Sequence, residues 1–144
     1  MTLYLPHYDS KALGNVIETE LARGDVAGWL RNVPRKKWAF TVPYQFNGQD
    51  HPMYPDFLVF RRQGKGLVVD ILEPHWSIGG DSAAKAKGLA EFATRHGDKF
   101  GRIELIIKEG GSLRRLDVNR GDLRDKVRAV GGNEHLRQLF DDLE

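Results

Sequence analysis

Two apolar runs dominate the hydropathy pattern of this chain. Residues 53–60 and 66–75 are rich in Val, Ile, Leu and Phe, and the segment Gln63-Gly64-Lys65-Gly66 between them supplies the glycines that a tight connection needs. This pattern predicts a β-hairpin. The second run is apolar from Leu67 to Leu72 except at Asp70, which is typical of a central strand covered on both faces. We therefore expect the hairpin to lie inside a larger sheet.

Helical and alternating patterns predict the elements around this hairpin. We expect a first helix from Asp9 or Ser10 to about Arg23, further helical turns at 26–32, a first strand at 38–46 ended by a turn at 47–50, a helix from Asp81 or Ser82 to near Gly97, strands at 102–108 and 113–118, and C-terminal helices at 120–130 and 133–143. The order helix, strands, helix, strand predicts an α/β fold. Its mixed central sheet would have about four to five strands flanked by helices, with two C-terminal helices.

Length and composition limit the class of protein. The 144 residues are enough for one domain, 1–144, with its own core. The chain has no cysteine, which excludes disulfides and thiolate metal sites and favours a reducing, cytoplasmic location. No apolar run is long enough to span a bilayer and no signal pattern opens the chain, so we expect no membrane partner. The net charge of +2 gives no overall nucleic-acid signal.

Two aspartates of the predicted hairpin are candidate metal ligands. Asp70 interrupts an apolar run, where an uncompensated carboxylate would be costly to desolvate. Asp56 follows Pro55 in the first run, and adjacent strands would place the two acids about 5 Å apart laterally. Mg²⁺ prefers such sites, which offer one or two carboxylates together with waters and phosphate oxygens. The alternative is that each acid is a strand-end residue that faces solvent or a Lys or Arg side chain.

A family resemblance supports the metal interpretation. The segment Tyr54-Pro55-Asp56-Phe57-Leu58-Val59 and the Asp70 strand resemble the core of the PD-(D/E)xK nuclease superfamily. The upstream Val26-x-x-Trp29-Leu30-Arg31-Asn32 and Val42-Pro43-Tyr44 resemble the nuclease domain at the C-terminus of type III restriction subunits and related DEAD/DEAH helicases. The resemblance runs from roughly Val16 to Ile107 and implies a restriction endonuclease-like core.

The resemblance also implies an activity and a set of ligands. It implies a metal-dependent DNA nuclease that hydrolyses phosphodiester bonds with Mg²⁺ or Mn²⁺ as cofactor. Asp56 and Asp70 would hold the ion. Many members of the superfamily complete the acidic cluster with a Glu on the first helix, so Glu18 or Glu20 could contribute here. Glu20 borders the buried stripe of that helix more closely than Glu18 does.

One position departs from the family pattern. The superfamily places a Lys two residues after the strand acid, and Leu72 stands there in this chain. Glu73-Pro74-His75 could itself be the acid-x-base pair, although period-two alternation puts Glu73 on the face opposite Asp70. His75 could also contact metal or phosphate beside an intact Asp56 and Asp70 site. Finally, Lys85 or Lys87 of the following helix could reach back, with Lys85 the better placed.

The densest basic run of the chain lies before the predicted hairpin and consists of Arg31, Arg35, Lys36 and Lys37. Such a run is usually a solvated loop. Beside a nuclease centre, the same side chains could grip phosphates, which position nucleic acid without reading its sequence.

Three functions are compatible with the sequence. The first is the metal-dependent DNA nuclease, acting with a helicase, a translocase or another restriction or defence subunit, because the chain carries no GxxxxGK[ST] phosphate loop of its own. A homodimer would supply the two centres that double-strand cleavage needs. The second is a catalytically silent nucleic-acid-binding module that retains the nuclease fold. The third is a domain that docks a larger restriction enzyme.

Overall fold

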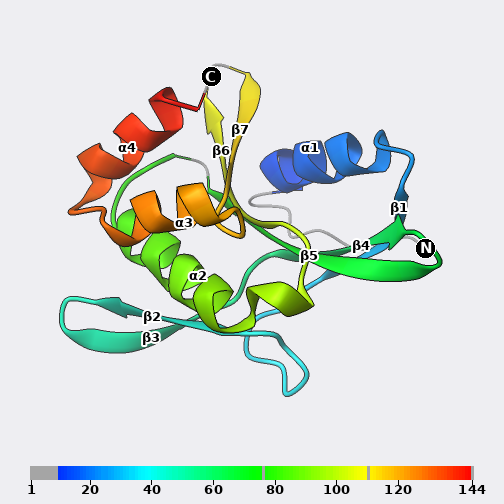
Figure 1. Ribbon diagram of the computed structural model, residues 1–144, viewed down its shortest axis with the longest axis horizontal. Coiled ribbons are helices and arrows are strands. Elements are labelled where there is room, and N and C mark those ends of the chain that lie inside the picture. The colour runs from blue at the N-terminus through cyan, green and yellow to red at the C-terminus, as the bar shows by residue number, and fades with distance from the viewer. Residues whose placement is uncertain (1–9, 76, 110, 144) are drawn as a thin grey trace.

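The computed structural model describes residues 10–75, 77–109 and 111–143. It shows a mixed α/β architecture, in which helices lie on both faces of a central sheet (Figure 1). The predicted fold class is therefore confirmed, including the central sheet of about five strands and the two C-terminal helices. Within the described residues, no helix combines the length and the apolar character needed to cross a membrane.

The predicted hairpin forms the middle of the sheet. The five strands are β1 (Val26–Arg31), β4 (Phe57–Gln63), β5 (Gly66–His75), β6 (Ile103–Glu109) and β7 (Ser112–Asp117), and they lie side by side in that order. β5 and β6 are parallel, and the other neighbours are antiparallel. β5 is thus a central strand, and because helices lie on both faces of the sheet its sequence is apolar from Leu67 to Leu72 except at Asp70.

Helices shield the two faces of the sheet. The helices are α1 (Ser10–Leu21), α2 (Ser82–His96), α3 (Gly121–Arg128) and α4 (Asn133–Asp141), with a short 3₁₀ turn at Gly97–Lys99. Val16 and Ile17 of α1 pack on Phe57, Val59 and Leu72, which point to one face. α2 covers the other face, where its alanines and Leu89 join Ile71 and Leu105 in the larger core.

Two segments differ from the sequence-based prediction. Residues 26–31 form the edge strand β1 and not a helical turn, because pairing with β4 outweighs the local helical spacing. The strand predicted at 38–46 is confined to β2 (Val42–Phe46), which lies outside the main sheet and pairs with β3 (Gln49–Met53). Asn47 and Gly48 connect β2 and β3 with φ values of 53° and 73°, as a tight hairpin turn requires.

The β2–β3 hairpin lies directly against α2. A Cβ atom built on Gly88 of α2 would stand 2.6 Å from the Tyr44 Cβ and 2.9 Å from the Pro43 carbonyl oxygen. Only a residue without a side chain permits this approach. The contact matters for the site, because it places Tyr44 beside the first turns of α2.

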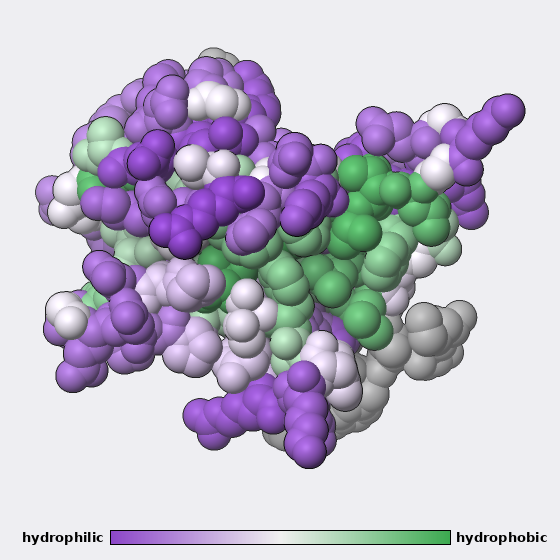
Figure 2. Space-filling model, turned by 60° about the horizontal axis from the view of Figure 1, so that its bottom comes forward, coloured by the Kyte–Doolittle hydropathy of each residue, from purple (hydrophilic) through white to green (hydrophobic). Residues whose placement is uncertain are grey.

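The face of the sheet that carries α2 is incompletely covered near the β4–β5 turn. Leu67, which is 62% exposed, lies there next to the partly buried Val69 and Phe60. Figure 2 shows hydrophobic surface over the part of the molecule where β4 and β5 lie, bordered by hydrophilic side chains.

Candidate active site

The register of the central hairpin decides which acids meet. Phe57 pairs with Leu72, so Asp56, which precedes β4, stands level with Glu73. Asp70 pairs with Val59 instead, three residues further along, or about 10 Å at the rise of a strand. The expectation that Asp56 and Asp70 lie close enough to share one cation is therefore wrong. Glu73 takes the place that the prediction gave to Asp70.

A pocket of about 370 Å³ opens where β5 ends. Four of its side chains are titratable and were singled out from the sequence, namely Asp56, Glu73, His75 and Lys85. They come from the residue before β4, the end of β5 and the first turn of α2. The remaining lining residues are Pro34, Pro52, Met53, Tyr54 and Pro74. The fold thus gathers an acid pair and two basic groups at one end of the sheet.

Glu73 is the central group of this pocket. It is only 4% exposed, and its Oε2 atom lies 3.1 Å from His75 Nε2 and 3.9 Å from Lys85 Nζ. Because a carboxylate only accepts, the imidazole Nε2 carries the proton of the shared hydrogen bond. The other oxygen, Oε1, is buried and has no hydrogen-bond partner among the described residues. A buried carboxylate oxygen without a partner is costly, and this favours a site that receives a ligand.

A second layer of contacts holds Lys85. Its ammonium lies 3.9 Å from Asp81 Oδ2 and 5.8 Å from the centre of the Tyr44 ring. Tyr44 donates a hydrogen bond of 2.7 Å from its hydroxyl to the same Asp81 oxygen. Burial and this hydrogen bond raise the pKa of Tyr44 to about 12, so the phenol stays a donor. The arrangement keeps Lys85 pointed at Glu73.

Asp56 is paired with a buried arginine. Arg31 Nη1 lies 2.8 Å from Asp56 Oδ1 and donates to the backbone carbonyls of Asn32 and Asp56, each at 3.1 Å. Arg31 is 7% exposed, and its guanidinium stacks 5.7 Å from the centre of the Phe57 ring. The prediction that Arg31 belongs to an exposed phosphate-gripping run is therefore wrong. Arg31 instead holds Asp56 in place through its side chain and its backbone carbonyl.

Asp70 belongs to a different network on the α1 face of the sheet, in which the acids are buried and the arginines partly buried. Its carboxylate accepts hydrogen bonds from the Arg61 guanidinium and from Arg102, whose backbone nitrogen lies at 2.6 Å and whose Nη2 lies at 2.7 Å. Burial alone would raise the pKa of Asp70, but these hydrogen bonds outweigh it and hold the pKa below its ordinary value. Two arginines therefore offset the cost of burying the Asp70 carboxylate, which the sequence had led us to expect.

The predicted helix acids also lie away from the pocket. Glu20 is buried and joins the Asp70 network, with its Oε2 atom 3.1 Å from Arg102 Nη1 and 2.8 Å from Arg115 Nη1. Glu18 is exposed on α1. The structure therefore brings Glu20 and Asp70 together, but through arginines and on the opposite face from Glu73. Neither helix acid completes a cluster with Asp56.

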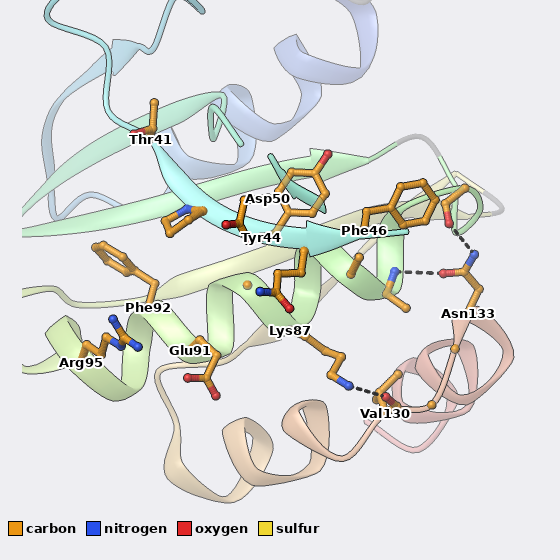
Figure 3. A pocket seen from close by; sticks show the side chains of 18 of the residues that line it. Thr41, Tyr44, Phe46, Asp50, Lys87, Glu91, Phe92, Arg95, Val130 and Asn133 are labelled. Atoms are coloured by element: carbon orange, nitrogen blue, oxygen red, sulfur yellow. Dashed lines mark hydrogen bonds between the residues drawn. The ribbon is translucent and has the colours of Figure 1, made fainter. Parts of the chain in front are cut away.

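The two candidate lysines of α2 point to different places. Lys87 donates a hydrogen bond of 3.1 Å to the Val130 carbonyl and lines a separate cavity of about 930 Å³ between the β2–β3 hairpin, α2 and the Gly131–Gly132 connection (Figure 3). Asn133 closes one end of that cavity through hydrogen bonds to Ala83 N and Gly80 O. Lys85 alone of the pair reaches the Glu73 pocket.

The pocket offers few protein ligands for a metal ion, so the relevant ions are those that bind only one or two carboxylates. Among the described residues, no group of three or more His, Cys, Asp or Glu side chains is arranged to hold a metal ion. Mg²⁺, however, is commonly held by one or two carboxylates, with water and substrate oxygens filling the other positions. Asp56 and Glu73, which line the same pocket, would be the two carboxylates of such a site.

The sequence contained a signal for the pairing of Asp56 with Glu73. Gln63 and Gly66 flank a two-residue turn and pair with each other, and counting outward from that pair leads to Asp56 opposite Glu73. Period-two alternation then places Glu73 and His75 on one face and Asp70 on the other. The contacts of these residues confirm that Asp70 and Glu73 face opposite sides.

Comparison with known proteins places the chain in a family. The YagJ family model matches residues 4–144. Protein YagJ of Escherichia coli (strain K12) is 35% identical over 137 residues, which cover 94% of this chain and 54% of the relative. The chain thus spans about half the length of that protein. No solved structure matches it. Because the family model covers almost the whole sequence, the chain belongs to the YagJ family.

Proposed function

We propose that this chain is a metal-dependent DNA nuclease whose centre is formed by Asp56, Glu73, His75 and Lys85. The observation that carries the proposal is the environment of Glu73, a buried carboxylate with one unpartnered oxygen in a pocket that it shares with Asp56. Ordinary structural acids are satisfied by protein partners, as Asp70 is. Glu73 is satisfied on one side only, which is what a ligand-binding carboxylate requires.

The order of elements supports the same proposal. The resemblance to the PD-(D/E)xK superfamily implies a helix, three strands, a helix and a further strand. α1, β1, β4, β5, α2 and β6 follow this order, with the β2–β3 hairpin inserted after the first strand. An aspartate before the second of these strands and an acid-x-base segment at the end of the third then fall at one pocket.

The residues of the pocket divide the chemistry among them. Asp56 and Glu73 would hold Mg²⁺ or Mn²⁺, and the chemistry that such an ion supplies is activation of water and stabilisation of charge on the phosphate. Lys85 approaches Glu73 from α2 and would contact a phosphate oxygen or the attacking water, the role left open by Leu72. His75 donates to Glu73 and sets the orientation of the carboxylate, as a positioning residue.

The proposal is tested by cleavage of linear and circular DNA by the purified chain with Mg²⁺, Mn²⁺ or EDTA. We expect metal-dependent cleavage that Glu73→Gln abolishes, because the amide cannot replace a charged ligand. Calorimetric titration with Mn²⁺ should show that the same variant loses metal binding. His75→Ala should reduce cleavage by about 10- to 100-fold, since it removes an outer contact of the ligand.

Glu18→Gln serves as the matched control, because Glu18 is an exposed carboxylate on the other side of the sheet. It should leave both cleavage and metal binding unchanged. Equal cleavage by Glu73→Gln and the unaltered chain would contradict the proposal. Thermal unfolding of each variant separates loss of a ligand from loss of the fold.

A silent nucleic-acid-binding module is the second candidate, and one observation favours it. Asp56 is already paired with Arg31, and Glu73 lies 3.9 Å from Lys85, so protein cations offset the charge of both acids. Such a module would bind DNA without binding Mn²⁺ and would cleave neither linear nor circular substrates. The calorimetric titration therefore separates the two candidates before any substrate is chosen.

Partners beyond DNA stay predictions from the resemblance. A helicase, a translocase or another restriction subunit would supply the motor, and a second copy of the chain would supply a second centre for double-strand cleavage. Sedimentation of the purified chain with and without DNA tests the homodimer. A monomer under both conditions would leave the second cut to another protein.

A further inference from the structure

The connection between β1 and β2 forms a loop that projects from the molecule on the side of the β2–β3 hairpin (Figure 1). Its residues 33–38 are all exposed, and residues 33–39 are named the basic loop below. Trp38 is 58% exposed, one of four large hydrophobic side chains that stand out among the described residues. An indole held in water beside charged residues is unusual for a structural tryptophan. It marks a surface that receives a ligand.

The basic loop is anchored at both ends. Asn32 is 1% exposed, and its side-chain amide donates to the Phe40 carbonyl at 2.7 Å and to the Pro55 carbonyl at 2.9 Å, while its oxygen accepts from Phe40 N at 2.9 Å. The Phe40 ring packs edge-on against Phe92 of α2 at 5.5 Å. The ends of the loop are thus fastened to the core and to the segment that carries Asp56.

The middle of the loop presents positive charge next to the indole. Arg35, Lys36 and Lys37 precede Trp38, and no acid occurs from Val33 to Thr41. None of the three cations forms an ion pair within the described part of the chain. Arg35 has a φ of 66°, and Ala39 N donates to the Lys36 carbonyl at 3.0 Å, so the cations sit on a tight turn. The loop offers cations that are available to a polyanion.

The loop also borders the proposed reacting centre. Pro34 lines the same pocket as Asp56, Glu73 and Lys85. A chain of phosphates held along the loop would therefore lead toward these residues. Proteins that bind single strands combine positive charge along the backbone path with aromatic side chains on which bases stack. Bases inside a duplex are stacked on each other and cannot reach an indole.

We propose that the basic loop is a binding site for single-stranded nucleic acid, with Trp38 as the base-stacking residue and Arg35, Lys36 and Lys37 as phosphate contacts. Binding to the basic loop does not depend on the proposed nuclease function. Only the statement that the bound nucleic acid leads from the loop toward Asp56, Glu73 and Lys85 rests on that function. It names the substrate class of that centre as a single strand or the frayed end of a duplex.

The test is fluorescence anisotropy with labelled oligo-dT, oligo-U and a blunt duplex, all in EDTA so that cleavage plays no part. We expect the single strands to bind more tightly than the duplex. Trp38→Ala should weaken single-strand binding by about 5- to 150-fold, which is the loss of one stacked base, and Trp38→Phe should retain most of it. Comparison of oligo-dT with oligo-U tells whether the strand is DNA or RNA.

Leu67→Ala is the matched control, because Leu67 is as exposed as Trp38 and lies outside the basic loop. It should bind single strands as the unaltered chain does. Replacing Lys36 and Lys37 by Gln should reduce the slope of log affinity against log salt by about 1.4, since each phosphate contact on a single strand contributes about 0.7. Thermal unfolding should show Trp38→Ala folded like the unaltered chain.

Tighter binding of the duplex, or equal binding by Trp38→Ala and the unaltered chain, would overturn the inference. Failure of the nuclease proposal gives a different pattern. A chain that cleaves nothing but binds oligo-dT through Trp38 retains the stacking site and loses the catalytic centre. A chain that cleaves DNA but binds oligo-dT equally well with Trp38→Ala retains the catalytic centre and lacks the stacking site.

Discussion

Two buried carboxylates on the same strand differ in how completely their neighbours satisfy them. Asp70 is 0% exposed and is surrounded by hydrogen bonds from Arg61 and Arg102. Glu73, three residues on, is 4% exposed and has one oxygen without a partner. Removing one partner from a satisfied internal charge network destabilises the fold, whereas a half-satisfied carboxylate is available to a ligand. The two substitutions therefore have contrasting consequences.

Asp70→Asn should destabilise the protein by about 3–5 kcal/mol, because it removes the buried carboxylate that Arg61 and Arg102 share and leaves Arg61 only the more distant Asp25, at 3.8 Å. Urea unfolding measures the change. Glu91→Gln is the control: it breaks the exposed pair with Arg128, 2.8 Å apart, and should change the free energy of unfolding by only about 0–1 kcal/mol. Equal midpoints for Asp70→Asn and the unaltered chain would show that the network is dispensable.

At the scale of the elements, the position of the β2–β3 hairpin depends on its packing against another element, α2. It pairs with no strand of the main sheet, and it packs closely against α2 at Gly88. That approach sets the position of Tyr44, whose hydroxyl and ring hold Asp81 and Lys85 near the pocket. The hairpin therefore connects helix packing to the geometry of the candidate site.

Gly88→Ala should destabilise the protein by about 1–3 kcal/mol, although alanine is the better helix former. The new methyl group would meet the Pro43 carbonyl oxygen at 2.9 Å, which is backbone and cannot rotate away. The measurement is urea unfolding, together with the single-turnover cleavage rate, which should fall as Tyr44 shifts.

Gly121→Ala supplies the comparison for this prediction. Gly121 begins α3, and a Cβ built there meets nothing within 4 Å. Its replacement should stabilise the protein by about 0.5–1 kcal/mol, because alanine lowers the conformational entropy of the unfolded chain. If both substitutions stabilised the protein to the same extent, the hairpin would not be held against α2.

Across the molecule, charges are sorted to the two faces of the sheet. The α1 face carries the internal network of Glu20, Asp70, Glu104 and their arginines, and the other face carries the pocket. The arginines offset the desolvation of Asp70, whereas Glu104 keeps a raised pKa, because burial outweighs the pull of Arg102 and Arg115. Protonation of the two acids should therefore act on stability with opposite signs.

The pH dependence of unfolding should show this contrast. A lowered folded-state pKa means that the stability from Asp70 is present above its ordinary pKa of 3.8 and is lost as the pH falls through the folded-state value. The raised pKa of Glu104 means the reverse, with stability present below its ordinary 4.5 and lost as the pH rises through the folded-state value.

Free energies of unfolding, measured by urea from about pH 2 to about pH 7, test these signs. Asp70→Asn should reduce the loss of stability that the unaltered chain shows as the pH falls through the pKa of Asp70. Glu104→Gln should reduce the loss of stability that it shows as the pH rises through the pKa of Glu104. Curves parallel to that of the unaltered chain would contradict the assignment of these two groups.

Local pattern was enough to predict much of the fold. The central hairpin, α2, β6, β7 and the two C-terminal helices all follow from apolar periodicity and turn residues, because their local preferences agree with their tertiary setting. The segment 26–31 did not, since its helical spacing is outweighed by pairing with β4. β3 was also missed, because Pro52 and the polar residues around it are not typical of a strand. It forms a strand by pairing with β2.

For the candidate site, the sequence determined which chemical groups are present, and the tertiary structure decided which of them meet. Asp56, Glu73, His75 and Lys85 were all candidates, together with Asp70, Glu20 and Arg31. A difference of three residues in register, and the alternation of side chains across a strand, sent Asp70 to the arginines and Glu73 to the pocket. Such sorting depends on pairing between distant segments, so composition and local spacing leave it open.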